Sequence, residues 1–427
     1  MSDGPSNVSP LTQLLQQVDR RILERDFPKA IEISQAFIFA HVHCLPSFIK
    51  LLGFMVEAGF DPSNIVIIPK AYSTIPQALH DLRVRIGFKV LLSDAELRPG
   101  CYDEYAAFTL NEACKIAEEE FARKGTSRPL RMILLDDGGT LTERWFIDGL
   151  ADRFETVSVQ QTTSGLFRPP FHDRSILKVN VAGSPAKRWF ESKVIAKGIT
   201  RKVLTWGTLE RRKVGIVGYG AIGKALADAM SAQDADIVVY DQSREVRSHR
   251  YENAASLDEL LQKTEIIFGC VGKDVFEGAE RPLEMAQTPR TFASCSSRDV
   301  EFRSLFRFSV PTEPPGPFGD VKISAGGLHT ILNGGFPVNF DREHEWEEEN
   351  EVALTRALLL AGVYQALGNL EHRSIEGSNL VTLGIEMQRH LVDRWLSINR
   401  ARTEEFGVRR ADFDNPEWWL SECFNGP

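Results

Sequence analysis

Short apolar runs alternate with longer amphipathic stretches over the first 180 residues of the chain. Four of these runs have the length of buried strands: 65–68, 90–92, 132–135 and 156–159. The stretch from Ser47 to Ala58 instead repeats its apolar positions every three or four residues, which predicts a helix ending before Gly59. Strands that alternate with helices indicate a largely parallel sheet covered on both faces.

A second alternating unit starts at Lys213. Its predicted strands are 214–217, 237–240, 266–270 and 291–294. The densely acidic run 342–351 then leads into ALTRALLLAGVYQAL, and carboxylates in a first turn favour the helix dipole. We therefore expect an α/β protein with two sheets and a helical C-terminal segment.

A glycine-rich turn separates the first strand of this second unit from the following helix. In KVGIVGYGAIGKALADAM, Gly218 permits a tight turn, Gly220 lets the backbone approach a pyrophosphate, and Gly223 allows close helix–strand packing. The next strand ends in Asp241, which can accept hydrogen bonds from ribose hydroxyls and repel a 2′-phosphate. The pattern predicts a Rossmann-type domain that binds NAD rather than NADP, with Arg244 tempering that preference.

A glycine-rich turn without a ligand is the competing interpretation of this motif. The strand before it, the helix after it and the acid at the end of the next strand together disfavour that interpretation.

Composition and charge narrow the function further. The chain of 427 residues carries 50 basic and 59 acidic side chains, a net charge of −9 without a long basic run, which disfavours nucleic-acid binding. No apolar stretch approaches the ~20 residues needed to span a bilayer, and the first residues lack the features of a secretory signal. Six scattered cysteines without a CxxC pair indicate neither a zinc site nor a disulfide framework. A cytoplasmic protein with a small-molecule substrate is expected.

Five motifs in order resemble those of S-adenosylhomocysteine hydrolase (adenosylhomocysteinase), between about residues 35 and 370. They are MILLDDGGTLT (132–142), VQQTTSG (159–165), KVGIVGYGAIGKA (213–225), SCSSRDVEF (294–302) and GGFPVNF (334–340). Members of that family use tightly held NAD to oxidise a ribose hydroxyl transiently, so that NAD is regenerated in each turnover.

The resemblance implies a substrate domain at 1–195, a Rossmann-type NAD-binding domain at 196–341 and C-terminal helices at 342–427 that return to the substrate domain. A homo-oligomer, dimer or tetramer, is expected. The cofactor positions that match the family are Thr162, Thr163 and Ser164 in the substrate domain and Gly218, Gly220, Ala221, Ile222, Gly223, Asp241 and Asn339 in the NAD-binding domain.

The catalytic positions match the family only in part. His43 and Asp137 occupy the family's proton-transfer histidine and its partner carboxylate, which suits general acid–base chemistry. The family's glutamate is replaced by Gln161, which cannot act as a base. The catalytic lysine, aspartate and asparagine of the family fall on Pro185, Trp189 and Phe190. Lys187 lies close by and could substitute for the lysine after a small shift of the alignment.

Each catalytic candidate also has a purely structural interpretation. Asp137 can belong to a strand-end turn, His43 can cap or pack against the helix that follows it, and Lys187 is more often a surface lysine. The HVHC stretch at 41–44 suggests a metal site, but no third clustered ligand is evident in the sequence, so no metal is predicted.

Three functional hypotheses follow from the sequence. The first is an NAD-binding, adenosylhomocysteinase-like enzyme that acts by transient oxidation of a substrate hydroxyl. The second is an NAD-dependent oxidoreductase or epimerase that acts on another hydroxylated metabolite, because the adenine-binding and lysine positions are lost. The third is a catalytically inactive homologue that senses NAD or mediates interactions, because Trp189 and Phe190 replace polar catalytic residues.

Overall fold

The computed structural model describes most of the chain. The described residues are 8–18, 33–92, 97–124, 130–166, 168, 176–243, 245–278, 288–310, 318–325, 327–369 and 379–399. The chain forms two compact units. The first comprises Met1–Ser93, Ala107–Glu191 and Glu348–Pro427, and the second comprises Asp94–Ala106 and Ser192–Glu347. The predicted α/β fold with two sheets is confirmed.

The first unit is built on a seven-stranded parallel sheet in the order β14-β6-β5-β4-β1-β2-β3. Its strands are β1 Phe37–Val42, β2 Ile65–Pro69, β3 Lys89–Val90, β4 Arg131–Asp136, β5 Glu155–Gln160, β6 Ile176–Asn180 and β14 Leu380–Thr382. All four predicted strands are present. The strands β1, β6 and β14 were not predicted, and β1 is an interior strand of the sheet, between β4 and β2.

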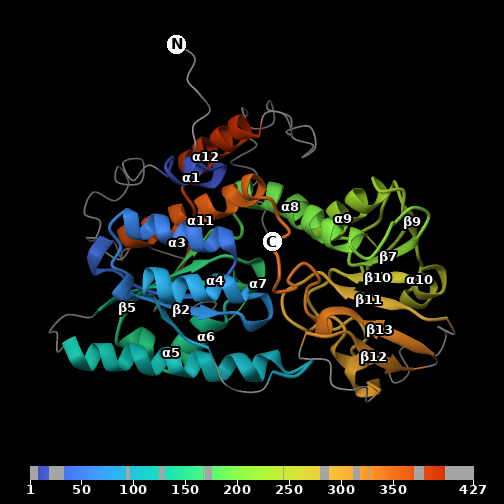
Figure 1. The fold of residues 1–427 in the computed structure, drawn as a ribbon, viewed down its shortest axis with the longest axis horizontal. Helices are drawn as coiled ribbons and strands as arrows, with labels where there is room; N and C mark the ends of the chain where they lie inside the picture. Colours follow the sequence, from blue (N-terminus) through green and yellow to red (C-terminus); the bar gives the residue numbers. More distant parts are fainter. Residues whose placement is uncertain are drawn as a thin grey trace, which may run out of the picture. The chain divides into compact units, whose positions relative to one another are not determined.

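Helices cover both faces of this sheet. The helices wholly or partly in the first unit are α1 Pro10–Leu15, α3 Pro46–Glu57, α4 Pro76–Asp81, α5 Tyr102–Lys124, α6 Thr140–Ile147, α7 Thr163–Leu166, α8 Pro185–Leu204, α11 Glu349–Asn369 and α12 Ile385–Ile398. Of these, α1 packs mainly on α11 and α3, and α12 packs mainly on α11. Apolar residues of α5 and α6 pack on one face with side chains of β1, β2 and β4. On the other face lie α3 and α11 (Figure 1). Among the described helices, none is both long and apolar enough to cross a membrane.

The helix predicted for 47–58 is α3. It begins with Pro46, whose fixed φ suits a first helical position. It ends before Gly59, whose φ of 103° lies in the left-handed region and whose amide donates to the carbonyl of Val56. The predicted C-terminal helix is α11, and it returns to the first unit because its buried residues complete the core there.

The second unit contains another seven-stranded sheet, in the order β12-β13-β11-β10-β7-β8-β9. Its strands are β7 Lys213–Val217, β8 Asp236–Tyr240, β9 Glu252–Asn253, β10 Ile266–Gly269, β11 Thr291–Ser294, β12 Val321–Ser324 and β13 Leu328–Ile331. All neighbours are parallel except β12 and β13. The helix α9 Ala221–Ser231 and part of α8 cover one face, and α10 Leu257–Lys263 covers the other.

The largest difference between the two units and the predicted domain boundaries is one segment. Residues 97–106, expected in the substrate domain, group with the second unit. The amide of Tyr102 donates to Asp299 at 3.3 Å, and Asp103 forms an ion pair with Arg298 at 2.6 Å. These contacts join residues about 200 positions apart in the chain, which local patterns do not reveal.

Candidate functional site

The first sheet changes direction between β1 and β4. From β1 the chain adds β2 and β3 on one side, whereas β4, β5 and β6 extend the sheet on the other side. Ligands of parallel α/β sheets bind at the carboxyl ends of the strands at such a switch point. His43 follows β1 and Asp137 follows β4, so the two catalytic candidates lie on either side of this point.

His43, Asp137 and Lys70 form one largely buried cluster. His43 Nε2 lies 3.1 Å from Asp137 Oδ2, and Lys70 Nζ donates to Asp137 Oδ1 at 2.8 Å. Lys70 follows β2 and is 2% exposed. A buried carboxylate between a histidine and an ammonium group is the arrangement that orients a histidine for proton transfer.

Ser73 completes the contacts of the histidine. Its Oγ lies 2.6 Å from His43 Nδ1, and the ring of Tyr72 packs edge-on against the imidazole. Because Asp137 is an acceptor, Nε2 carries the proton of a neutral imidazole and Nδ1 accepts from Ser73. The Ser73 hydroxyl has a second acceptor, the carbonyl of Lys70 at 3.2 Å. Because Ser73 Oγ lies on the lone pair of Nδ1, a proton that reaches Nδ1 comes through Ser73.

Burial sets the protonation states in this cluster. It lowers the pKa of His43 to about 4, with the positive charge of Lys70 acting in the same direction. Burial also acts to raise the pKa of Asp137, but the charge of Lys70 and the contact with His43 hold it well below its ordinary value. At neutral pH the cluster therefore contains a neutral histidine and an ionised carboxylate.

The sequence patterns predicted neither Lys70 nor Ser73 as a site residue. Their signal was the segment KAYST directly after the apolar run IVIIP, where the carboxyl end of a parallel strand places polar side chains at the ligand-binding edge. A single lysine after a strand is common, and only the contact with Asp137 distinguishes Lys70.

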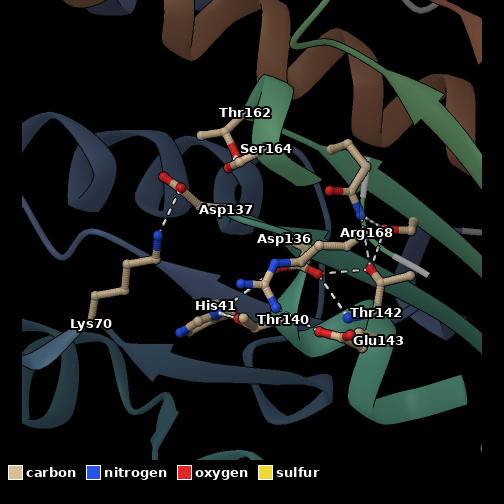
Figure 2. A network of polar contacts seen from close by, with 12 residues as sticks. His41, Lys70, Asp136, Asp137, Thr140, Thr142, Glu143, Thr162, Ser164 and Arg168 are labelled. Carbon is tan, nitrogen blue, oxygen red and sulfur yellow. Dashed lines mark hydrogen bonds and ion pairs between the residues drawn. The ribbon is translucent and has the colours of Figure 1, made fainter. Parts of the chain in front are cut away.

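The neighbouring aspartate has a structural role. Asp136 Oδ2 accepts from the amide and the hydroxyl of Thr142, both at 2.7 Å, and its carboxylate points away from Asp137 (Figure 2). The Nδ1 of His41 lies 3.7 Å from Asp136 Oδ1 and 3.1 Å from the hydroxyl oxygen of Thr140. His41 and His43 thus contact different aspartates, and this arrangement does not favour a metal ion bound by both histidines.

One group within the described part of the chain has the spacing of metal ligands. It consists of Asp341, Glu343 and His344 and is largely exposed. Asp341 already forms an ion pair with Lys202 at 2.8 Å and accepts from Trp346. The group therefore gives no support to a metal site.

Lys187 is not a surface lysine. It is 5% exposed, its Nζ donates to the carbonyl of Gln161 at 2.6 Å, and it forms an ion pair with Glu191 one helical turn later. Gln161 directly follows β5, and its backbone N–H donates to the carbonyl of Asp136. Because Lys187 binds the carbonyl of Gln161, it reaches the same sheet edge as Asp137. The Nε2 of Gln161 is a buried donor without a partner among the described residues, as expected at a ligand site.

The threonine-rich loop after β5 presents polar groups to solvent. Thr163 and Ser164 are exposed, Thr162 is half-buried, and the hydroxyls of Thr162 and Ser164 lie 3.1 Å apart (Figure 2). These residues belong to the first unit, whereas the glycine-rich turn belongs to the second. Their role toward a cofactor stays a prediction.

The glycine-rich turn lies at the switch point of the second sheet, because β7 has β8 on one side and β10 on the other. Gly218 has a φ of 91°, and a Cβ on Gly223 would lie 2.0 Å from the carbonyl oxygen of Gly218. A Cβ on the exposed Gly220 would meet no protein atom within 4 Å. Two glycines thus shape the turn and the third leaves open space, which fits a dinucleotide approaching the backbone.

The remaining predicted cofactor residues surround this turn in different ways. Ala221 and Ile222 begin α9. Asp241 follows β8, and its carboxylate accepts from the amides of Tyr219 at 2.8 Å and Ser243 at 2.9 Å. These bonds hold the carboxylate beside the turn. Arg244 lies outside the described residues.

Asn339 differs from the other predicted cofactor residues because its side chain is buried. Its Nδ2 donates to Glu347 at 2.9 Å, so this part of the carboxamide already has a partner within the second unit.

A protein-family model matches the middle of the chain. Residues 181–274 match the NAD-binding domain of the D-isomer specific 2-hydroxyacid dehydrogenases. The match spans less than a quarter of the chain and includes the glycine-rich turn and Asp241. It shows an NAD(P)-binding domain of the dehydrogenase type. The adenosylhomocysteinase resemblance is not shown by this match and stays a prediction.

Two curated relatives cover most of the chain. They are the uncharacterised proteins MT0113 and Rv0104 from two strains of Mycobacterium tuberculosis, each 28% identical over 374 residues, which is 85% of this chain and 70% of the relative. Their names describe no activity.

Three solved structures are similar to parts of this chain at low identity. An acyclic imino acid reductase in complex with NADPH and D-Arg has a TM-score of 0.31 and 13% identity, over 61% of this chain and 73% of that one. A dehydrogenase from Rhizobium meliloti has a TM-score of 0.31 and 14% identity, over 68% of this chain and 92% of that one. The protein TT0316 from Thermus thermophilus has a TM-score of 0.32 and 14% identity, over 70% of this chain and 96% of that one. These likenesses carry no functional argument.

Proposed function

We propose that this protein is an NAD-dependent oxidoreductase that acts on a hydroxyl or ketone of a small polar metabolite. The observation that carries the proposal is the neutral His43 held by an ionised Asp137 at one switch point, in a chain whose other sheet carries the matched NAD(P)-binding domain.

The cofactor is assigned to the second unit. Gly218, Gly220 and Gly223 would hold the pyrophosphate at the start of α9, and Asp241 would accept from the ribose hydroxyls. When bound, the dinucleotide supplies the group that accepts or returns a hydride. The carboxylate of Asp241 disfavours a 2′-phosphate, which supports NAD over NADP.

Transfer of the substrate proton is assigned to residues of the first unit. Oxidation of a hydroxyl releases a hydride and a proton. The Ser73 hydroxyl passes its own proton to His43 Nδ1 and takes the substrate proton in its place. Asp137 stabilises the imidazolium that forms, and Lys70 keeps Asp137 ionised and oriented. Gln161 Nε2, which has no partner among the described residues, is a donor for a substrate oxygen.

The test separates cofactor binding from turnover. Native protein is analysed by mass spectrometry for bound dinucleotide, and then assayed by the absorbance of the reduced cofactor with NAD or NADP against hydroxy acids, oxo acids and nucleosides. We expect NAD to bind and one substrate class to change the absorbance. His43→Gln and Asp137→Asn should retain NAD but lose turnover by a factor of about 10² or more, whereas the exposed Asp152→Asn retains both.

Two outcomes would refute the proposal. A protein that neither carries NAD nor is stabilised by it against heat is not an NAD-dependent enzyme. Binding of NAD without turnover of any class would favour the inactive sensing homologue.

Transient oxidation is the second candidate function. It is favoured by the hydrogen-bonding distance between His43 and Asp137, the two catalytic positions that match the adenosylhomocysteinase pattern. In that case adenosylhomocysteine would release adenosine and homocysteine without net NADH. Release that Asp137→Asn abolishes would support this candidate over the first.

A further inference from the structure

Two cysteines follow neighbouring strands of the second sheet. Cys270 comes directly after β10 and Cys295 directly after β11, and the last paired residues of these parallel strands are Gly269 and Ser294. The amide of Cys295 still donates to the carbonyl of Gly269 at 2.9 Å. The two cysteines are therefore the next neighbours in register.

Their side chains lie on the same face of the sheet. Both pack into the apolar cluster that includes Phe268 and Ala293. The residues directly before these two, Ile267 and Phe292, pack on the opposite face of the sheet. Neighbouring strands lie about 4.8 Å apart, within the Cα separation of about 4.4–6.8 Å that a disulfide spans. The thiols of Cys270 and Cys295 are also within hydrogen-bonding reach of each other.

We infer that Cys270 and Cys295 form a dithiol modification site that an oxidant of the peroxide class converts to an intramolecular disulfide. The half-exposed Cys270 reacts first: its sulfur attacks the O–O bond, which gives a sulfenic acid and releases water or an alcohol. The sulfur of Cys295 then displaces the sulfenic hydroxyl, which leaves as water with the proton of Cys295. Two electrons and two protons pass from the thiols to the peroxide.

The order of the two steps follows from the surroundings of the thiols. Burial raises the pKa of Cys295 well above its usual range, so this thiol stays protonated and does not react with the oxidant first. Cys44 and Cys114 are buried in the first unit, and Cys101 precedes α5. None of these three follows a strand that pairs with another cysteine-bearing strand in the described structure.

The modification site adjoins the dinucleotide turn. A Cβ on Gly218 would lie 2.8 Å from the carbonyl oxygen of Cys270 and 2.6 Å from a methyl group of Val271, so the two backbones are in close contact. Glu301 links the same segments, because it accepts from the amides of Val271 at 2.6 Å and Cys295 at 3.1 Å. A disulfide that moves Cys270 therefore moves the support of Gly218, and we expect oxidation to weaken dinucleotide binding.

The test uses full-length protein carrying Cys101→Ser and Cys423→Ser, treated with hydrogen peroxide and analysed by peptide mass spectrometry. We expect a peptide crosslinked through Cys270 and Cys295 and the loss of two titratable thiols. Addition of Cys295→Ala should abolish the crosslink and leave a sulfenic acid on Cys270 that dimedone traps. Cys114→Ser is the matched control and should leave the crosslink unchanged.

The second readout is the affinity for NAD, measured by calorimetry before and after oxidation. We expect about a tenfold loss, typical of coupling between sites, that dithiothreitol reverses and that Cys295→Ala does not show. A folded protein in which Cys270 is oxidised without a crosslink to Cys295 would overturn the modification site. Unchanged NAD affinity of the crosslinked protein would overturn the coupling. The crosslink is scored without added NAD, so its result is independent of the proposed function.

Discussion

His43 is a largely buried histidine whose neutral form is favoured by its surroundings, and this residue makes the stability of the protein depend on pH. Its ring is hydrogen-bonded at both nitrogens, by Ser73 and Asp137, and packs against Tyr72. Burial, which lowers the pKa of His43 to about 4, outweighs the attraction of the Asp137 carboxylate. The same balance that makes His43 a proton acceptor makes its protonation costly to the fold.

The free energy of unfolding should fall as pH decreases from 6.5 to 4. The folded-state pKa of His43, about 4, is below the value of 6.5 in the unfolded chain, so the unfolded state binds the additional proton in this window. The contribution is up to about 3 kcal/mol, present in full above pH 6.5 and lost below pH 4. Urea unfolding across this range should show a shallower decline for His43→Gln, whereas the exposed His80→Gln should follow the wild type.

Lys70→Met should destabilise the protein by about 3–5 kcal/mol, because it leaves the buried Asp137 carboxylate without its cation. The control is Lys50→Met, which breaks an ion pair with Glu349 that is partly exposed and contributes at most about 1 kcal/mol. Chemical denaturation at pH 7 measures both. Equal stability of the two variants would show that Lys70 does not hold Asp137.

At the scale of elements, the strand–turn–helix from β7 to α9 separates the structural and ligand-binding roles of its glycines. Gly223 is needed by the fold, because the helix packs directly against the carbonyl of Gly218. The fold does not require a glycine at position 220. Gly220 is exposed, its φ of −77° is open to any residue, and no protein atom lies within 4 Å of the position of a Cβ.

Gly220→Ala and Gly223→Ala should therefore differ in kind. Gly223→Ala should destabilise the protein by about 1–3 kcal/mol, as overpacking does. Gly220→Ala should leave the melting temperature of the unliganded protein nearly unchanged but weaken NAD binding about tenfold or more, because its methyl group occupies the approach of the pyrophosphate. Thermal melts with and without NAD distinguish the two. A Gly220→Ala variant that binds NAD as tightly as wild type would remove the turn from the cofactor site.

At the scale of the whole chain, the two ends of the sequence build one unit. The C-terminal helix α11 packs on the first sheet and against α1 and α3, and β14 adds a strand next to β6. Gly362 lets α11 approach this sheet: a Cβ there would lie 2.6 Å from Val181 and 2.9 Å from Val159. The first unit therefore depends on residues that lie far apart in the chain.

Two helical glycines test this packing. Gly53→Ala, in α3, has open space around the new Cβ and should stabilise the protein by up to about 1 kcal/mol through helix propensity. Gly362→Ala has the same propensity gain but forces α11 away from the sheet, with a net loss of about 1–3 kcal/mol. Denaturant midpoints compare the pair. If Gly362→Ala were as stable as Gly53→Ala, close packing of α11 would not be required.

The sequence by itself determined the features that depend on neighbouring residues. Apolar runs predicted the strands β2, β4 and β5, helical periodicity and Gly59 predicted α3, and the spacing of three glycines predicted the turn between β7 and α9. These features are local because strand length, helix periodicity and backbone freedom act over a few residues. The interior strand β1 escaped prediction, since FIFAHV carries His41 on a strand buried on both faces.

Only the tertiary structure decided which residues meet. Lys70, His43 and Asp137 lie on loops after three different strands, and parallel pairing alone brings these carboxyl ends to one edge. Burial, another property of the assembled sheet, makes Lys187 an interior residue. Strand order likewise places Cys270 beside Cys295. A chemical site is fixed by distance and desolvation between remote segments, and neither quantity is encoded in the local pattern of the chain.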